Sequence, residues 1–196
     1  MRIAIYGATG MIGSRVAAEA VSRGHHVTGI SRSGGVGLTQ GDAGSADFTR
    51  SVSADHEVVV SAIGPSRTTP DAGEFRASVA NLVTTLGHAR LVVAGGAGTL
   101  EVEGVRLVDD PQFPAAYRSE ALKQGEVLDD LRALGSTNWT YLSPAPEIAP
   151  GDRTGVFALG ADSPVGGKVS AEDYAVALVD EIEHPAHAGR RFTVAN

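Results

Sequence analysis

The sequence predicts an α/β fold in which a doubly wound, mostly parallel sheet carries helices on both faces. Short apolar runs typical of buried strands recur along the 196 residues, and segments with apolar residues at helical spacing separate them. Such alternation favours βαβ units and therefore a parallel sheet. A glycine-rich turn at residues 7–13 joins the first predicted strand, 2–6, to the first predicted helix. In such folds ligands bind where the strands end and the helices begin.

Composition limits the class of protein. A chain of 196 residues forms one full core, so we expect a single domain over residues 1–196, with small substrate-side elements at about 98–116 and, toward the C-terminus, 145–170. The net charge of −7, without a basic run, argues against nucleic acid as a partner. The absence of cysteine excludes disulfides and thiolate metal sites. No signal pattern or membrane-length apolar run is present, so we expect a cytoplasmic monomer or homodimer without a membrane partner.

The turn contains three glycines in the spacing Gly-x-x-Gly-x-x-Gly, at Gly7, Gly10 and Gly13. A pyrophosphate must approach bare backbone N–H groups at a helix N-terminus, and a Cβ would hold it off. Gly7 allows the sharp turn, Gly10 the approach of the phosphate, and Gly13 the close packing of helix on strand. We interpret the turn as the phosphate-binding element of a Rossmann-type domain; ordinary turn glycines are the alternative. The residues expected to contact the nucleotide are Gly7, Thr9, Gly10, Met11, Ile12 and Gly13.

The end of the second predicted strand, 26–32, bears on the choice of cofactor. NAD-binding proteins usually place Asp or Glu there, where the carboxylate accepts a hydrogen bond from the ribose 2′-hydroxyl. This chain has Arg32 and Ser33 instead. A guanidinium pairs with a 2′-phosphate through two parallel hydrogen bonds and stacks beside adenine. The pattern favours NADP(H), with NAD(H) and a merely solvated Arg32 as the alternatives.

A further strand end is expected to line the cofactor. The apolar run 57–63 is typical of a buried parallel strand, and its last residues are followed by Gly64. Because ligands bind at the carboxyl ends of such strands, we expect Ala62, Ile63 and Gly64 against the ribose and pyrophosphate. Arg67, in the polar loop that follows, either meets a phosphate or acidic substrate or is an unpaired loop arginine.

Several segments together resemble one known superfamily. Gly7-Ala8-Thr9-Gly10 with Gly13, and the runs 92–98, 138–145 and 169–175, are similar to the extended and atypical short-chain dehydrogenase/reductases. The likeness is greatest to their small NAD(P)H-binding, NmrA-like group, which includes flavin and biliverdin-IXβ reductases. The resemblance implies adenine contacts from Asp42 and Ala43, nicotinamide contacts from Pro144 and Ala145, and a ribose contact from Lys123. From the residues alone, Asp42 is equally a loop cap and Lys123 a solvated helix lysine.

The catalytic residues of that superfamily are incomplete here. Its typical members place a serine after the fifth strand, where this chain has the glycine-rich segment 95–98 and only Thr99 nearby. They also carry Tyr-x-x-x-Lys on the next helix, whereas Tyr117 and Lys123 have five residues between them. At about 100° per residue, six steps leave two side chains widely separated around a helix. Tyr117 and Lys123 are therefore weak catalytic candidates, and the catalytic group is not assigned.

The remaining expectations concern local structure. The six histidines lack the spacing of a metal site, so no metal is expected. Asp129 and Asp130 are interpreted as exposed charges. The other expectations are a helix at 115–134 that buries Leu128, Leu131 and Leu134, an irregular lid at 100–114, a strand at 155–159, and a last helix capped by Ser170 with Asp173 in an imperfect capping box.

Three functions fit the pattern. The first is an NADP(H)-dependent oxidoreductase that transfers hydride to a small conjugated acceptor such as a flavin, quinone or carbonyl, because the cofactor carries the chemistry and the missing acid is then tolerable. The second is a non-catalytic NADP(H)-binding redox sensor of NmrA-like type, which the same missing residues support. The third is an NAD(P)-dependent epimerase or isomerase, which the absent Tyr-x-x-x-Lys pair disfavours. These hypotheses rest on analogy at the level of the fold.

Overall fold

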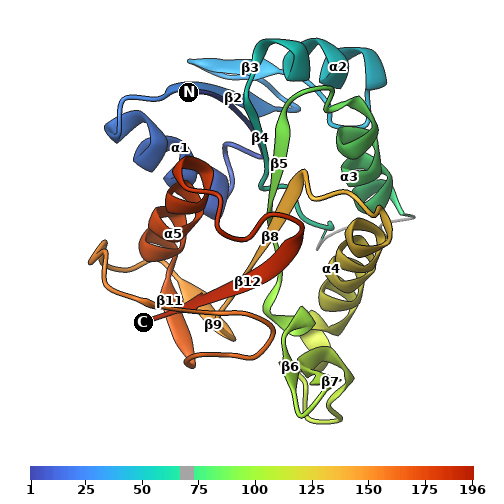
Figure 1. Ribbon diagram of the computed structural model, residues 1–196, viewed down its shortest axis with the longest axis vertical. Coiled ribbons are helices and arrows are strands. Elements are labelled where there is room, and N and C mark those ends of the chain that lie inside the picture. The colour runs from blue at the N-terminus through green and yellow to red at the C-terminus, as the bar shows by residue number, and fades with distance from the viewer. Residues whose placement is uncertain (67–72) are drawn as a thin grey trace.

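The centre of the molecule is a sheet to which eight strands contribute among the residues described, 1–66 and 73–196, in the computed structural model (Figure 1). Neighbouring strands run parallel, except that the short edge strand β10 pairs antiparallel with β12. In order across the sheet the strands are β10 (Ala158–Gly160), β12 (Arg190–Ala195), β8 (Trp139–Pro144), β5 (Arg90–Ala94), β4 (Val58–Ser61), β1 (Arg2–Tyr6), β2 (His26–Ser31) and β3 (Leu38–Gln40). The predicted doubly wound parallel sheet is confirmed.

Helices cover both faces of this sheet (Figure 1). Because successive strand residues point to opposite faces, β1 sends Ile3 and Ile5 into one hydrophobic core, and Ala4 and Tyr6 into another. The first core is covered by α1 (Met11–Ser22) and α5 (Ala171–Glu183), and the second by α2 (Ala46–Asp55), α3 (Glu74–Thr85) and α4 (Ala115–Ala133). The fold is therefore a three-layer α/β/α sandwich of the Rossmann type.

The strand order creates a crevice beside β1. The chain passes from β1 outward to β2 and β3 and then returns to add β4 on the other side of β1. Tyr6, at the end of β1, lies opposite both Ile30 of β2 and Ser61 of β4. The segments that follow these three strands therefore leave the sheet at one edge, on either side of a topological switch point.

The segment between β5 and α4 is more regular than predicted. It contains a 3₁₀ turn, η1 (Ala97–Thr99), a hairpin of β6 (Glu101–Val102) and β7 (Val105–Arg106), and a second 3₁₀ turn, η2 (Leu107–Asp109). The expectation of an irregular segment at 100–114 is thus wrong. Glu103 and Gly104 have φ of 53° and 80°, as a two-residue hairpin loop requires, but Glu is an unusual first residue for it and gave no turn signal.

The segment between β8 and α5 also differs from the prediction. The strand expected at 155–159 begins only at Ala158, and two short strands, β9 (Glu147–Ala149) and β11 (Lys168–Ser170), pair in parallel with each other. Val169 is buried against the first core, and Ile148 packs against the same core. Three-residue strands that alternate only once are too short for a periodic signal, which is why they were not predicted.

The ends of two helices correct further details. Leu128 and Leu131 are buried as predicted, but Leu134 follows the last residue of α4 and is 45% exposed, so its expected burial was wrong. Ser170 Oγ caps α5 by accepting a hydrogen bond from Asp173 N at 2.9 Å. The carboxylate of Asp173 does not complete a capping box. It accepts from the N–H groups of Thr154 and Gly155, both at 2.8 Å, and so fixes the loop before β10.

Asp129 and Asp130, on α4, are exposed as expected but are not isolated charges. Arg106 of the hairpin donates to Asp129 at 3.0 Å, and Arg76 of α3 donates to Asp130 at 2.6 Å. Partners on other elements, 23 and 54 residues away in sequence, account for these two ion pairs.

Candidate nucleotide-binding site

The glycine turn has the geometry that its spacing predicts. Gly7 has a φ of 81°, and a Cβ there would lie 2.5 Å from the carbonyl oxygen of Ala62. A Cβ on Gly13 would lie 2.1 Å from the carbonyl oxygen of Gly7, so α1 packs directly on the turn. A Cβ on Gly10 would meet only Gly7 O, at 3.3 Å, and otherwise project into open space. Gly7 and Gly13 are thus required by packing within the chain, whereas Gly10 keeps a surface free of side-chain atoms.

The N-terminus of α1 is suited to an anion. Gly10 is its N-cap, provides no side-chain hydrogen bond, and is followed by no acidic residue in the first turn. The backbone N–H groups of Met11, Ile12 and Gly13 have no hydrogen-bond partner among the described residues, while Ser14 N already donates to Gly10 O at 3.0 Å. Unsatisfied N–H groups and the positive end of the helix dipole attract phosphate. The residues present therefore fit a pyrophosphate at this point, and Thr9, Gly10 and Met11 are exposed there.

The turn after β2 presents Arg32 to solvent. Ser31 Oγ donates to Gly34 O at 3.0 Å, and Gln40 Nε2 donates to the carbonyl oxygen of Arg32 at 3.2 Å, so the backbone of the turn is fixed. Arg32 and Ser33 are exposed. Among the residues that the structure describes, no carboxylate pairs with the Arg32 guanidinium. The charge is thus available at the end of the strand next to β1.

The loop after β3 contains Asp42 and Ala43. Asp42 is exposed, and its Oδ1 accepts a hydrogen bond from Gly44 N at 2.8 Å, which makes it a cap of its own turn. Ala43 is buried in the second core, and its carbonyl oxygen accepts from Asn81 Nδ2 at 2.6 Å. The carboxylate of Asp42 therefore has a structural partner, which agrees with the loop-cap interpretation of this residue and leaves its adenine contact a prediction.

The ends of the central strands place the other predicted residues along the same edge. Ala62 and Ile63 are half-buried and Gly64 is exposed, directly after β4. Pro144 and Ala145, at the end of β8, are buried, and Ala145 N donates to Val194 O at 3.1 Å. Since β4, β5 and β8 are consecutive parallel strands, these segments leave the sheet on one side. Arg67 lies outside the described residues.

Tyr141, which the sequence did not single out, holds the loop where the superfamily's serine would stand. Its hydroxyl accepts a hydrogen bond from Gly96 N at 3.1 Å and donates to Gln124 of α4, with Oε1 at 3.1 Å. A Cβ on Gly95 would lie 1.9 Å from the Tyr141 ring, so this loop needs glycine for packing on the ring. Burial raises the pKa of Tyr141 far above its ordinary value. The hydroxyl is a structural group and is not poised to exchange protons.

The hydroxyl groups of Thr99, which follows β5, and Ser143, which lies in β8, are also buried and hydrogen-bonded within the protein. Thr99 and Ser143 are both fully buried, and their hydroxyl oxygens lie 2.9 Å apart in a hydrogen bond. Thr99 Oγ1 also donates to Gly96 O at 2.8 Å, and the buried guanidinium of Arg191 donates to the Thr99 carbonyl oxygen. Thr99 therefore does not replace the missing serine as an accessible acid.

Tyr117 and Lys123 stand on α4 as the sequence indicates. Tyr117, in the first turn, is 58% exposed, and Lys123 is half-buried. Their separation of six residues corresponds to about 120° around the regular helix, so they do not form a Tyr–Lys pair on one face. Neither residue lies in the interlocked group of Tyr141, Thr99 and Ser143.

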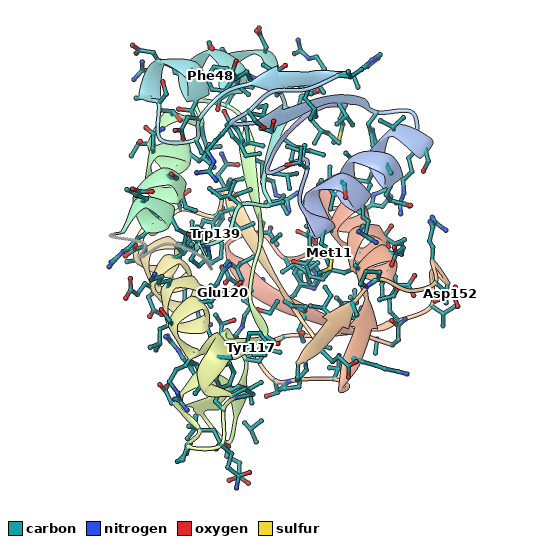
Figure 2. All side chains as sticks on the ribbon, turned by 180° about the vertical axis from the view of Figure 1, so that it is seen from behind. Met11, Phe48, Tyr117, Glu120, Trp139 and Asp152 are labelled. Atoms are coloured by element: carbon teal, nitrogen blue, oxygen red, sulfur yellow. The ribbon has the colours of Figure 1, made fainter. Side chains whose placement is uncertain are left out.

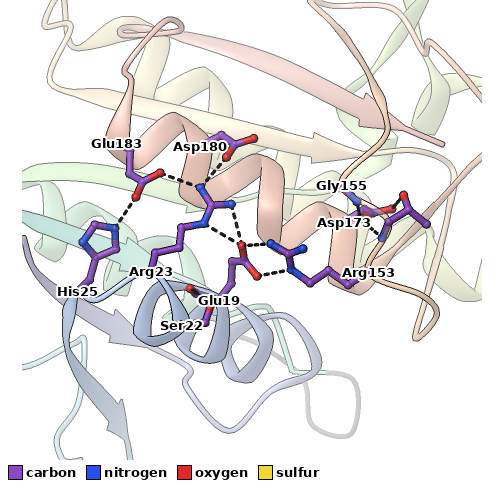
Figure 3. Close-up of polar contacts among 10 residues, drawn as sticks. Glu19, Ser22, Arg23, His25, Arg153, Gly155, Asp173, Asp180 and Glu183 are labelled. Carbon is purple, nitrogen blue, oxygen red and sulfur yellow. Dashed lines mark hydrogen bonds and ion pairs between the residues drawn. The ribbon is translucent and has the colours of Figure 1, made fainter.

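A charged network between α1 and α5 fixes the helix that follows the glycine turn (Figure 3). Arg23, at the end of α1, donates to Asp180 and Glu183 of α5 at 2.7 Å each, and its guanidinium also lies 2.7 Å from Glu19. Arg153 donates to both carboxylate oxygens of Glu19 at 2.7 Å. Hydrogen bonds from Arg153 and Arg23 hold the pKa of Glu19 below its usual value, although burial opposes them.

Two other properties of the described residues bear on the class of protein. No cluster of three or more His, Asp or Glu side chains is arranged to hold a metal ion within ranges 1–66 and 73–196. None of the helices described there is long and apolar enough to cross a membrane.

The fold and the bare N-terminus of α1 define a dinucleotide-binding protein of the doubly wound class. Its sequence places it further: a profile of the NAD(P)H-binding family matches residues 7–185, and the chain belongs to that family. A nicotinamide cofactor is therefore its ligand, as predicted.

Three relatives match this chain over its full length. The uncharacterized protein YwnB of Bacillus subtilis strain 168 is 37% identical over 213 aligned positions, covering 100% of this chain and 99% of YwnB. The structure of a candidate exported protein from Burkholderia pseudomallei is 42% identical, with a TM-score of 0.90 and full coverage of both chains. That of a candidate NADH-flavin reductase from Streptococcus pneumoniae is 32% identical, with a TM-score of 0.91 and coverage of 100% and 99%. These findings confirm the resemblance to the atypical short-chain dehydrogenase/reductases and support an oxidoreductase.

Proposed function

We propose that the protein is an NADPH-dependent oxidoreductase that reduces a small conjugated acceptor, such as a flavin, a quinone or a conjugated carbonyl. The observation that carries the proposal is the N-terminus of α1, where Gly10 provides no side-chain cap, together with Arg32 at the end of the neighbouring strand, whose guanidinium pairs with no carboxylate among the described residues. An anion site after β1 and a cation at the end of the adjacent strand β2 suit the pyrophosphate and the 2′-phosphate of one dinucleotide. The flavin reductase named among the relatives agrees with the choice of acceptor.

In this proposal the segments at the carboxyl ends of the parallel strands bind different parts of the cofactor. The N–H groups at the start of α1 bind the pyrophosphate, and Arg32 with Ser33 binds the 2′-phosphate. The segments that follow β4 and β8 line the ribose and nicotinamide, and Lys123 approaches the ribose from α4. When bound, the reduced cofactor supplies a hydride, that is, two electrons and one proton. The protein orients the two reactants and excludes water from them.

The second proton of the reduction comes from water. Overall, NADPH, acceptor and one proton give NADP⁺ and the reduced acceptor. The buried hydroxyls of Tyr141, Thr99 and Ser143 all have protein partners and do not serve as the donor. A flavin or quinone accepts hydride and is then protonated by solvent, whereas an isolated ketone needs an acid at its oxygen during the transfer. The engagement of these three hydroxyls within the protein therefore favours a conjugated acceptor and disfavours an epimerase.

The test combines a binding titration with turnover. NADPH and NADH are titrated separately into the protein, and NADPH oxidation is then followed by nicotinamide absorbance with riboflavin, FMN, menadione and an aliphatic ketone. We expect NADPH to bind at least tenfold more tightly than NADH, and turnover with a flavin or quinone but not with the ketone. Equal affinity for the two cofactors contradicts the NADPH assignment, and turnover of the ketone alone contradicts the acceptor class.

Because the hydroxyls of Tyr141, Thr99 and Ser143 are all hydrogen-bonded within the protein, a second candidate function is a non-catalytic NADP(H)-binding redox sensor that acts on a protein partner. Its distinguishing result is tight NADPH binding without oxidation by any acceptor in the panel. The cytoplasmic location and a monomeric or homodimeric state remain part of either proposal.

A further inference from the structure

Tyr117 is the one tyrosine of this chain whose ring reaches solvent. The chain has four tyrosines, and the rings of the other three are buried, with 1%, 0% and 1% of Tyr6, Tyr141 and Tyr174 exposed. Tyr117 is 58% exposed in the first turn of α4. Its ring therefore offers an apolar, aromatic surface to solvent at the start of α4.

The position of Tyr117 on α4 is that of a core residue. Ala121, Gln124 and Leu128, which are four, seven and eleven positions after it, are all buried. At about 100° per residue, seven positions turn through about 700°, so Tyr117 and Gln124 lie within roughly 20° of the same direction. Tyr117 thus points along the centre of the buried stripe. Figure 2 shows its ring leaving the helix on the side that faces the sheet.

The ring is exposed because the core ends before it. α4 precedes the parallel strand β8, so its first turn lies at the edge where the strands end. Ala121, one turn later, packs against η1, where a Cβ on Gly98 would lie 2.7 Å from the Ala121 Cβ. Tyr117 therefore lies one helical turn before the point where α4 contacts η1. This places it nearer to the edge where the strands end and where we expect the cofactor.

The turn that carries Tyr117 is rigid. Tyr117 N donates to Pro114 O at 3.0 Å. Its neighbour Arg118 donates to Asp110 O at 2.8 Å and to Phe113 O at 3.2 Å, and lies 5.7 Å from the centre of the Phe113 ring. The Tyr117 hydroxyl has no hydrogen-bond partner among the described residues. The backbone that carries the ring is therefore fixed, and an aromatic side chain has only two torsion angles to lose when a flat ligand covers it.

We propose that Tyr117 is the specificity-determining residue of the acceptor site, where its ring stacks on a planar, fused-ring acceptor such as an isoalloxazine or a naphthoquinone. This inference rests on the proposed function, since it names the acceptor class of the same site. It assigns the aromatic face, and not the hydroxyl, as the part of Tyr117 that acts.

The experiment measures binding without turnover. Wild-type protein is saturated with NADP⁺, which cannot donate hydride, and riboflavin binding is followed by the quenching of flavin fluorescence, with menadione as a competitor. The variants are Tyr117→Phe, which keeps the ring, and Tyr117→Ala, which removes it. Leu122→Ala is the matched control, because Leu122 is also exposed, at 46%, and lies about 140° away around α4.

We expect Tyr117→Ala to weaken riboflavin and menadione about tenfold, in the range that stacking on an aromatic side chain contributes. Tyr117→Phe and Leu122→Ala should stay within twofold of wild type, and NADPH affinity should be unchanged in all three. Equal binding by the Ala and Phe variants overturns the inference, whether both retain wild-type affinity or both lose it. The absence of saturable binding of both compounds to wild type also overturns it. Ring-dependent binding without NADPH oxidation refutes the proposed reductase and not the stacking contact.

Discussion

Substitution of Gly13 by alanine tests whether the turn and α1 form one packed unit. The new Cβ would lie 2.1 Å from Gly7 O and 2.8 Å from Gly7 C, both of them backbone atoms that cannot rotate away. A carbon and an oxygen need roughly 3.2 Å, so α1 must move from the turn by about 1 Å. Overpacking of this kind costs about 1–3 kcal/mol, or roughly 2–12 °C in Tm for a chain of this size.

Gly10→Ala is the matched control for stability. Its Cβ would meet only Gly7 O, at 3.3 Å, and Gly10 has a φ of −74°, which alanine adopts without strain. We expect Gly10→Ala to unfold within about 2 °C of wild type but to bind NADPH at least tenfold more weakly, because the methyl group occupies the approach of the pyrophosphate.

The assay is thermal unfolding of both variants without nucleotide, followed by titration with NADPH. Gly13→Ala should lose both stability and affinity, and Gly10→Ala only affinity. A Gly13→Ala variant with the wild-type Tm would refute the packing argument. Undiminished NADPH binding by Gly10→Ala would show that the turn is structural and that the nucleotide lies elsewhere.

Three further predictions address other parts of the molecule. Arg32→Glu should weaken NADPH far more than NADH in parallel titrations, and an equal loss for both would contradict a 2′-phosphate contact. Tyr141→Phe should lower the free energy of unfolding in urea by about 1–2 kcal/mol, because Gly96 N–H and Gln124 lose their hydrogen-bond partner. Turnover should stay within a few-fold of wild type, and a collapse of turnover in folded protein would make this tyrosine the acid. Glu19 has a lowered pKa in the folded chain, so its contribution to folding stability is full above its unfolded pKa and is lost as the pH falls through the folded value. Glu19→Gln should therefore lower the free energy of unfolding by about 1–2 kcal/mol at pH 7, and acidification should destabilise this variant less than wild type. Parallel curves of stability against pH for the two proteins would contradict the role of the network.

Local sequence determined the glycine turn, which we predict binds phosphate, and the cation on the neighbouring strand. Gly7, Gly10 and Gly13 lie within one turn and the start of one helix, so their spacing alone fixes which backbone N–H groups are left bare. Arg32 was found for a similar reason, because the end of a strand beside β1 is recognisable from the apolar run before it. Parallel strands carry their ends to a common edge, and this general rule sufficed to place Ala62 there, whereas Ala145 was placed by the family resemblance.

Only the tertiary structure decided what the hydroxyl groups and charges do. Tyr141 contacts Gly96 from 45 residues away, and Arg23 reaches Asp180 from 157 residues away; no local pattern encodes such a pair. Sequence spacing predicted that Tyr117 and Lys123 lie on different faces of the helix, yet it could not show where the core under α4 ends, and therefore which residue of the buried stripe is left exposed. The physical reason is that backbone conformation and periodic burial follow from near neighbours, whereas the partner of a long polar side chain is set by which surfaces the whole fold brings together.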